Sequence, residues 1–294
     1  MFLTYCYGGE RFSKPGLLSV LSIRARLPDA VIDVYTDAPA AFTGTGARVH
    51  SLSAIDVAAG SAPVGYRHRV KIAVLLRHAL SAPEGSPVLY TDTDTYFRGL
   101  PGAKGTMPDL GPRPWVMHNL DGLVGDDFYP VFARFLRRES ALVADSEWPG
   151  MAPGFKMFNS GLVGFRATRE AARLLLEAQR LTDWFSVHFH EQPEWGEQFA
   201  LAWIGEQAYG VAADPMGFHH YWNQNTEVST LLARMTRADI EKIAGDEARF
   251  DALLADAAAL AHDPRHRRTA LRKKRWNRSL QKRLIAWRGR GLRE

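Results

Sequence analysis

The chain has 294 residues, 46% of them hydrophobic, which is enough to bury one large α/β domain or two smaller ones. Its single cysteine, Cys6, excludes an internal disulfide and fits a reducing compartment. There is no apolar run long enough to span a bilayer and no secretory signal pattern at the N-terminus, so we expect a cytoplasmic protein.

The first third of the chain alternates between strand and helix patterns. Strands are predicted at 2–7, 30–37 and 88–91, and helices at 17–27 and 69–80. Between the first strand and helix lies the loop GGERFSKPG, in which Ser13 and Pro15 are expected as the N-cap and an early helix residue. This alternation predicts an α/β fold with a Rossmann-like, mostly parallel sheet flanked by helices. Ligands bind beyond the carboxyl ends of the strands in such sheets.

The middle and the end of the chain are less regular. Further strands are predicted at 114–120 and 160–166, further helices at 169–181 and 197–208, and one or two helices at 238–262. We therefore expect a ligand-binding domain over residues 1–235, a helical extension over 236–264 and a basic tail over 265–294.

Two aspartates, Asp92 and Asp94, end the apolar strand in PVLYTDTDTYFRG. Side chains at i and i+2 of a strand share a face, so the two carboxylates should lie close together and need a cation between them. An arginine, a lysine or a divalent metal would serve, and Mg²⁺ and Mn²⁺ prefer carboxylate oxygens. A simple turn is the competing interpretation, because Asp and Thr are common where strands end.

Seven motifs, taken in chain order, form a pattern that can be compared with known families: TYCYGGERF, VYTDAP, GYRHRVKIAVLL, VLYTDTDTYF, MFNSGLVGFR, WGEQFALAWI and GFHHYWNQ. Over roughly residues 2–225 this order resembles the glycosyltransferases of the GT-A fold, which use sugar nucleotides and carry an Asp-X-Asp motif. The likeness is greatest to bacterial enzymes that add hexoses to lipooligosaccharide or similar glycans. It implies Mn²⁺ or Mg²⁺ as cofactor, UDP-hexose as donor, a glycan or lipid-linked acceptor and, by a slight preference, retention of anomeric configuration.

The resemblance also implies a metal site. Asp94 should ligate the metal, and Asp92 should hold the metal, the ribose or both. A late histidine is the expected third ligand. His219 and His220 are adjacent and would face opposite ways on an extended segment, so only one can bind, and we select His219.

Nucleotide contacts are implied around the ends of the first strands. Thr4, Tyr7 and Gly8 would flank the nucleotide, and Asp37 would accept hydrogen bonds from uracil or ribose; a cap or turn aspartate is the plainer interpretation of Asp37. Arg67 and Lys71, four residues apart, should share a helix face that meets the diphosphate, unless they are merely solvated.

Sugar and acceptor recognition is expected later in the chain. Asn159 in FNSG combines a donor and an acceptor beside a glycine that permits close backbone approach. Glu197 in WGEQFAL would recognise the sugar or the acceptor, or act as base; a carboxylate that favours a helix N-terminus is the alternative.

Other functions fit these motifs less well. A haloacid-dehalogenase-type phosphatase needs Thr or Val four residues after its first aspartate, where Tyr96 stands, and VGDDF follows too soon to be its later motif. A sugar-nucleotide pyrophosphorylase needs a Gly-rich basic loop, of which GGERFSKPG is a poor version. A non-catalytic binding module is the third alternative. Zinc at His188 and His190, with Glu191 or Glu194, lacks a spacing signature.

The tail, residues 265–294, differs in charge from the rest. It carries thirteen Lys and Arg against one acid, whereas the remainder carries 24 basic and 31 acidic residues. Trp276, Leu280, Leu284 and Trp287 would form one stripe of a helix, which suits an anionic membrane surface. A helix packed on the body is the main alternative, and nucleic-acid binding is unlikely because the acidic body offers no basic groove.

Overall fold

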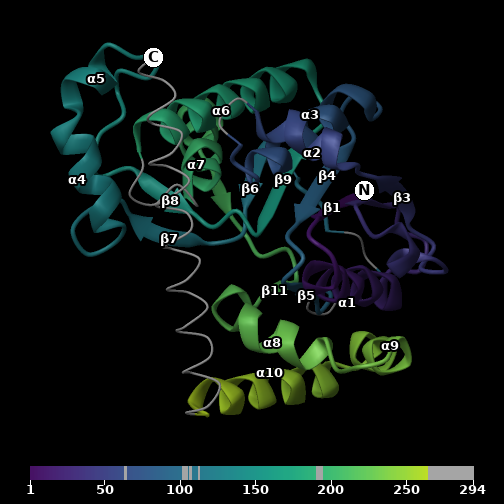
Figure 1. The fold of residues 1–294 in the computed structure, drawn as a ribbon. Helices are drawn as coiled ribbons and strands as arrows, with labels where there is room; N and C mark the ends of the chain where they lie inside the picture. Colours follow the sequence, from purple (N-terminus) through teal and green to yellow (C-terminus); the bar gives the residue numbers. More distant parts are fainter. Residues whose placement is uncertain (63–64, 101–104, 106–107, 112, 190–194, 264–294) are drawn as a thin grey trace.

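The computed structural model describes residues 1–62, 65–100, 105, 108–111, 113–189 and 195–263 (Figure 1). A central sheet has the strand order β10-β6-β9-β4-β1-β2-β3. Its strands are β1 (Phe2–Cys6), β2 (Ile32–Thr36), β3 (Arg48–Ser51), β4 (Pro87–Thr91), β6 (Trp115–Met117), β9 (Leu162–Arg166) and β10 (Ala212–Ala213). All neighbouring pairs are parallel except those of β9, which runs antiparallel to β4 and β6. The predicted mostly parallel α/β sheet is therefore confirmed.

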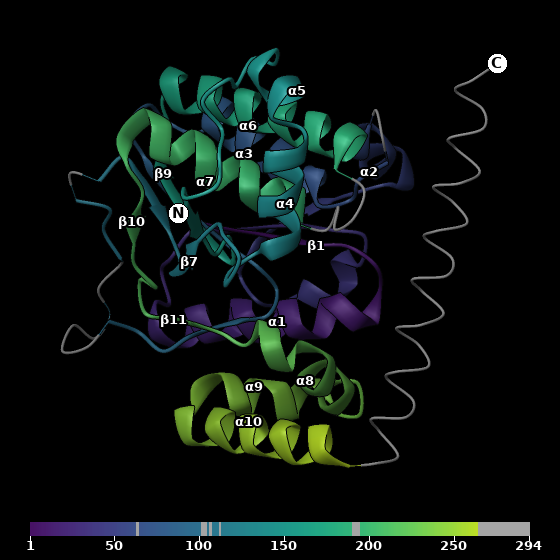
Figure 2. The same ribbon diagram turned by 90° about the vertical axis from the view of Figure 1, so that its left-hand side faces the viewer.

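Helices cover both faces of this sheet (Figures 1 and 2). On one face lie α2 (Ala54–Ser61), α3 (Arg69–Ser81), α6 (Arg169–His188) and α7 (Gly196–Tyr209), and on the other lies α1 (Glu10–Arg26). The strand β4 shows why both faces need cover: Val88 and Tyr90 belong to one core cluster and Leu89 to the other. Alternate side chains point to opposite faces, so a strand that is apolar throughout must be buried on both.

The first helix begins earlier than the sequence indicates. It starts at Glu10 rather than near residue 17, and Gly9, at φ 74°, precedes it. Ser13 is therefore a buried helix residue and not the predicted N-cap. The chain enters the helix at the glycines because Asp37 accepts hydrogen bonds from both Gly8 N (3.1 Å) and Gly9 N (3.3 Å). Positive φ angles at these two positions suit glycine, which has no Cβ.

Two short antiparallel pairs lie outside the main sheet. One joins β5 (Thr95–Phe97) to β11 (Phe218–His220), and the other joins β7 (Leu120–Leu123) to β8 (Lys156–Phe158). The helix α4 (Pro130–Arg138) lies beside the second pair, and α5 (Ser140–Ala144) lies beyond α4, further from these strands (Figure 1). The predicted strand at 114–120 is thus divided between β6 and the first residue of β7.

The last described helices form a unit beneath α1 (Figure 2). After the short turn η3 (Trp222–Gln224) come α8 (Asn225–Leu232), α9 (Arg237–Gly245) and α10 (Glu247–His262); α8 and α9 contact α1, and α8 also contacts α10. The predicted domain boundary at residue 235 thus passes through packed helices, and the division remains a prediction. The tail at 265–294 lies outside the described residues. None of the helices in the described part has the length and hydropathy needed to cross a membrane.

Candidate active site with a metal centre

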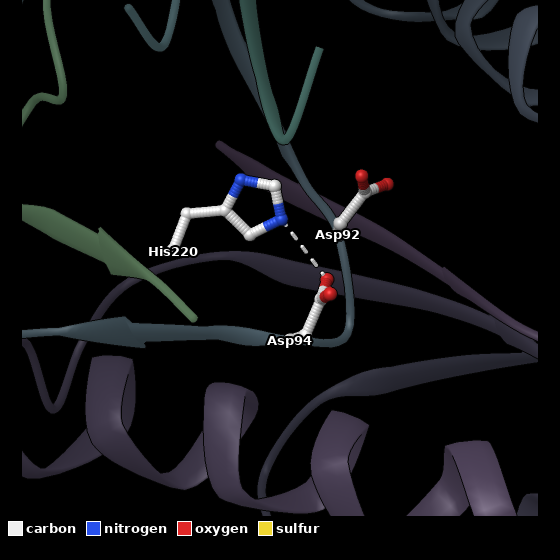
Figure 3. Close-up of side chains that lie close together, drawn as sticks. All are labelled: Asp92, Asp94 and His220. Atoms are coloured by element: carbon white, nitrogen blue, oxygen red, sulfur yellow. Dashed lines mark hydrogen bonds and ion pairs between the residues drawn. The ribbon is translucent and has the colours of Figure 1, made fainter. Parts of the chain in front are cut away.

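Three side chains converge where β4 leaves the sheet (Figure 3). Asp92 directly follows β4, Asp94 directly precedes β5, and His220 ends β11. Each offers one ligand atom, and these atoms lie within 4.8 Å of one another. In the described part of the chain this is the group of acidic and histidine residues that could hold a metal ion. The two carboxylates thus lie close together, as the sequence indicates, at the carboxyl edge of a parallel strand.

The histidine in this group is His220, so the prediction of His219 is wrong. In the pairing of β11 with β5, adjacent residues point to opposite faces. His220 Nε2 lies 3.2 Å from Asp94 Oδ1, whereas the ring of His219 packs edge-on against Phe250 at 5.6 Å between centroids. The sequence showed that one histidine would face the carboxylates, and the register of the β5–β11 pair decides which.

The segment FNSG holds the His220 ring in place. Asn159 Oδ1 accepts a hydrogen bond from Gly161 N at 2.9 Å and lies 2.9 Å from His220 Nδ1. Because this amide atom is an acceptor, Nδ1 must carry the proton that it donates to Asn159. His220 Nε2 is thereby directed to Asp94. Asn159, predicted as a sugar-binding or acceptor-binding residue, supports the histidine in this structure.

Electrostatics favour positive charge at His220. Burial of the ring lowers the pKa of His220, but its hydrogen bond to Asp94 and the charges of Asp94 and Asp92 raise that pKa by more, so it lies above its ordinary value. A proton or a metal ion at Nε2 would satisfy the same carboxylates.

Lys71 supplies a second cation to the site. Its ammonium lies 3.2 Å from Asp92 Oδ1 and 2.8 Å from Glu197 Oε1, and it donates to Ser160 O at 2.7 Å. Burial lowers the pKa of Lys71, but the charges of Asp92 and Glu197 outweigh it and hold that pKa above its usual value. Burial raises the pKa of Asp92, and Lys71 and His220 lower it by more. Lys71 is therefore a buried counter-ion rather than the solvated side chain of the alternative interpretation.

Glu197 is buried, with 4% of its surface exposed, at the start of α7. Its Oε1 accepts from Lys71 and, at 2.9 Å, from Ser160 Oγ. No hydrogen bond reaches Oε2 from the described residues. Glu197 thus occupies the helix-start position of the alternative interpretation and is also joined through Lys71 to the aspartates.

A further polar group lies beside Asn159 and was missed in the sequence. Tyr129 donates its hydroxyl proton to Asp121 Oδ2 at 2.7 Å, and Gln198 Nε2 donates to the same oxygen at 3.2 Å. Burial raises the pKa of Asp121 above its usual value. Tyr129 has φ 57°, a left-handed conformation that is uncommon for a side chain of this size and is often found at functional sites. The only sign of this polar group in the sequence was Gln198, which stands next to Glu197.

The residues predicted to contact nucleotide are distributed differently. Tyr7, Gly8 and Asp37 meet where β1 and β2 end, and there Asp37 holds the glycine loop. Thr4 lies inside β1 with 2% of its surface exposed, and no described residue pairs with its hydroxyl, so its nucleotide contact stays a prediction.

Arg67 and Lys71 do not share a helix face as predicted, since α3 begins only at Arg69. Arg67 is exposed, while Lys71 points into the site. The four-residue spacing fails because a helix is needed for it to bring side chains together. The alternative of a zinc site placed His188 on a strand, but in the structure His188 is the last residue of α6. The other residues of that alternative, His190, Glu191 and Glu194, lie outside the described residues.

No protein family and no curated protein matches the sequence. Among solved structures, galactosyltransferase LgtC in complex with donor and acceptor sugar analogues is 16% identical, with a TM-score of 0.43, over 72% of this chain and 73% of that one. Mouse xyloside xylosyltransferase 1 in its apo form is 14% identical, with a TM-score of 0.42, over 72% and 83%. An active-site mutant of LgtC is 18% identical, with a TM-score of 0.40, over 72% of each chain. With TM-scores this low, the likeness says nothing by itself of what this chain binds or transfers.

Proposed function

We propose that the chain is a metal-dependent glycosyltransferase that transfers a hexose from a nucleotide sugar, with UDP-hexose as donor, to a glycan or lipid-linked glycan. The observation that carries this proposal is the convergence of Asp92, Asp94 and His220 at the carboxyl edge of β4, with ligand atoms within 4.8 Å. Ligands in α/β sheets bind beyond that edge. Two carboxylates and one imidazole suit Mn²⁺, or Mg²⁺ with water completing its shell.

The donor set also fits a metal in its finer chemistry. His220 gives its Nδ1 proton to Asn159, which leaves Nε2 with a lone pair toward Asp94 Oδ1 at 3.2 Å when the ring is neutral. A lone pair and a carboxylate oxygen repel unless a cation lies between them. Asp92, Asp94 and His220 would hold that cation, and when bound it would neutralise the charge that develops on a leaving diphosphate.

The chain's own side chains account for sugar binding and orientation. Lys71 pairs with both Asp92 and Glu197 and so offsets the repulsion between these neighbouring acidic side chains. Glu197 Oε2, which receives no hydrogen bond from the residues that the structure describes, would accept one from a sugar hydroxyl. Asp121 has a raised pKa, and its Oδ2 accepts hydrogen bonds from Tyr129 and Gln198. It is suited to bind a second hydroxyl of the sugar. Asp37, exposed where β2 ends, remains the candidate acceptor for the nucleoside, with Tyr7 and Gly8 beside it.

The proposal extends to where the enzyme works. Residues 265–294 are proposed to bind an anionic membrane surface, where lipid-linked acceptors lie, so that a cytoplasmic enzyme is held peripherally. The support is the sequence of the tail, with its thirteen basic residues and its tryptophan stripe.

Isothermal titration with UDP, with and without Mn²⁺, tests the proposed donor and metal. We expect UDP to bind at least about 10-fold more tightly with Mn²⁺, because Asp92, Asp94 and His220 would hold the ion and its charge would offset that of the diphosphate. An absence of UDP binding in both conditions would contradict the nucleotide-sugar proposal. Release of phosphate from phosphomonoesters, without any affinity for UDP, would favour the phosphatase alternative.

A further inference from the structure

We propose that Asn225, the first residue of α8, is a positioning residue that restricts Asp94 to a single metal-binding oxygen. The helical unit beneath α1 would thereby control the geometry of the metal centre. This inference rests on the metal centre of the proposed function. It concerns a residue outside the Asp-X-Asp strand and outside the histidine segment β11.

The contact itself is short and polar. Asn225 Nδ2 donates a hydrogen bond to Asp94 Oδ2 at 2.9 Å. The other oxygen, Asp94 Oδ1, faces His220 Nε2 at 3.2 Å. The side chain of Asp94 is only 11% exposed, so the two contacts together account for both oxygens in a nearly closed site. A hydrogen bond to an ionised group is stronger than one between neutral groups, and burial strengthens such a bond further.

A second hydrogen bond fixes which end of the amide faces Asp94. Ser229 lies one turn further along α8, and its hydroxyl donates to Asn225 Oδ1 at 3.0 Å. With Oδ1 engaged in this way, the amide nitrogen must face the carboxylate. Turning the amide over would place its oxygen against the Asp94 carboxylate, which only accepts, and would lose that bond. The pair Asn225–Ser229 is thus a rigid donor built into one helix.

The backbone ties the same segment to Asp94. Tyr221 N donates to the Asp94 carbonyl oxygen at 3.0 Å, and the Tyr221 side chain is fully buried. The stretch from β11 to α8 therefore holds the backbone and both carboxylate oxygens of a single aspartate. α8 in turn contacts α10 and α1, so the position of Asn225 depends on the helical unit.

The consequence concerns how the carboxylate meets a metal. With Oδ2 held by Asn225, Asp94 would bind through Oδ1 only, beside His220 Nε2. A partner of this kind fixes the orientation of a ligand in advance, and its loss typically weakens metal affinity 10-fold to 100-fold. Without Asn225, the carboxylate is free to rotate and to offer both oxygens.

The test is a Mn²⁺ titration of the full chain, without nucleotide, followed by the EPR signal of the free ion. We expect Asn225→Ala to raise the Kd for Mn²⁺ about 10-fold to 100-fold and to change the zero-field splitting of the bound ion, because the carboxylate is no longer fixed. Asn223→Ala is the matched control: Asn223 is exposed on η3, makes no hydrogen bond within the described residues, and should leave both readouts unchanged.

Ser229→Ala is the second variant, for use should Asn225→Ala fail to fold as judged by circular dichroism. It removes only the bond that orients the amide, so we expect a Kd for Mn²⁺ between those of the wild type and Asn225→Ala. A folded Asn225→Ala protein, or failing that a Ser229→Ala protein, with wild-type Kd and wild-type EPR spectrum would overturn this inference alone. A wild-type protein that does not bind Mn²⁺ would instead overturn the metal centre and this inference with it.

Discussion

The imidazole of His220 occupies the space that a side chain on Gly161 would need. An ideal Cβ on Gly161 would lie 2.1 Å from His220 Nδ1 and 2.2 Å from Cε1, distances that real atoms do not adopt. The glycine of FNSG is therefore required by the histidine of the proposed metal centre, 59 positions later in the chain.

Gly161→Ala should therefore displace His220. We expect a loss of unfolding free energy of about 1–3 kcal/mol from overpacking, together with weaker Mn²⁺ binding. Gly245→Ala is the control, because nothing lies within 4 Å of a Cβ built at Gly245. Chemical denaturation and Mn²⁺ titration on both variants check this. Unchanged Mn²⁺ affinity in Gly161→Ala would show that the ring position does not matter for the metal.

Asp94→Asn should keep the fold, because the side chains are nearly isosteric, and should remove most transfer or donor-hydrolysis activity. Loss of a metal that neutralises the leaving diphosphate costs several kcal/mol of barrier, which is at least about 100-fold in rate. Asp126→Asn, at an exposed aspartate paired with Arg137, serves as the control. Rate assays alongside thermal melts decide, and near wild-type turnover in folded Asp94→Asn would rule out its role.

Glu197→Gln should lower kcat while UDP affinity stays nearly unchanged, if Glu197 binds the sugar or acts as base. If it is only a helix-start acid, turnover should persist. The buried contact with Lys71 adds a stability effect of about 1–3 kcal/mol, because the lysine loses one of its two carboxylates. Glu206→Gln on the same helix removes a more exposed ion pair with Lys156 and should cost no more than about 1 kcal/mol. Kinetics and melts on one preparation separate these outcomes.

Asp33 should make the fold acid-sensitive away from the site. It is buried in β2 beside His50 Nε2 at 2.6 Å, His78 Nε2 at 3.5 Å and the Arg48 guanidinium. Burial raises the pKa of Asp33, but the hydrogen bonds from His78, Arg48 and His50 lower that pKa by a larger amount. The folded pKa therefore lies well below the unfolded value. The stabilisation is therefore complete above the unfolded pKa of about 4 and is lost as pH falls from there toward the folded pKa.

Asp33→Asn checks this pH dependence. At pH 7 we expect it to reduce the free energy of unfolding by about 1.5–3 kcal/mol, the value of a hydrogen bond to a charged group. As pH falls below about 4, toward the folded pKa, the wild type should lose that advantage progressively, so that the gap between the two denaturation midpoints narrows. Parallel denaturation curves across this range, with a constant gap between the proteins, would show that Asp33 does not titrate as inferred.

Deletion of residues 265–294 should abolish sedimentation with anionic liposomes and leave donor hydrolysis in solution intact. Each basic side chain near such a surface contributes about 1 kcal/mol, which salt screens. The described fold ends at α10, whose last residue is His262, so the truncation leaves every described helix complete. A full-length protein that ignores liposomes at low salt, or a truncated protein that unfolds, would favour a tail packed on the body.

Local patterns in the sequence were enough to predict the inner strands of the sheet and the pair of carboxylates, but not the edge strands β3 and β10. The strand before Asp92 and the helices α3, α6 and α7 show in the periodicity of apolar residues, because burial on one or both faces selects side chains at fixed spacing. Asp92 and Asp94 were also predicted to lie close together, and they do, but the extended geometry ends at Thr91 and the two aspartates lie in the turn between β4 and β5, as in the alternative interpretation.

Only the tertiary structure decided which distant side chains join them. The choice of His220 over His219 follows from the β5–β11 register, which local sequence does not encode. Asn225 reaches Asp94 because α8 packs there, and Lys71 reaches Glu197 across 126 positions of the chain. Such contacts depend on how whole elements pack, and packing is set by the sum of many weak apolar contacts rather than by any motif.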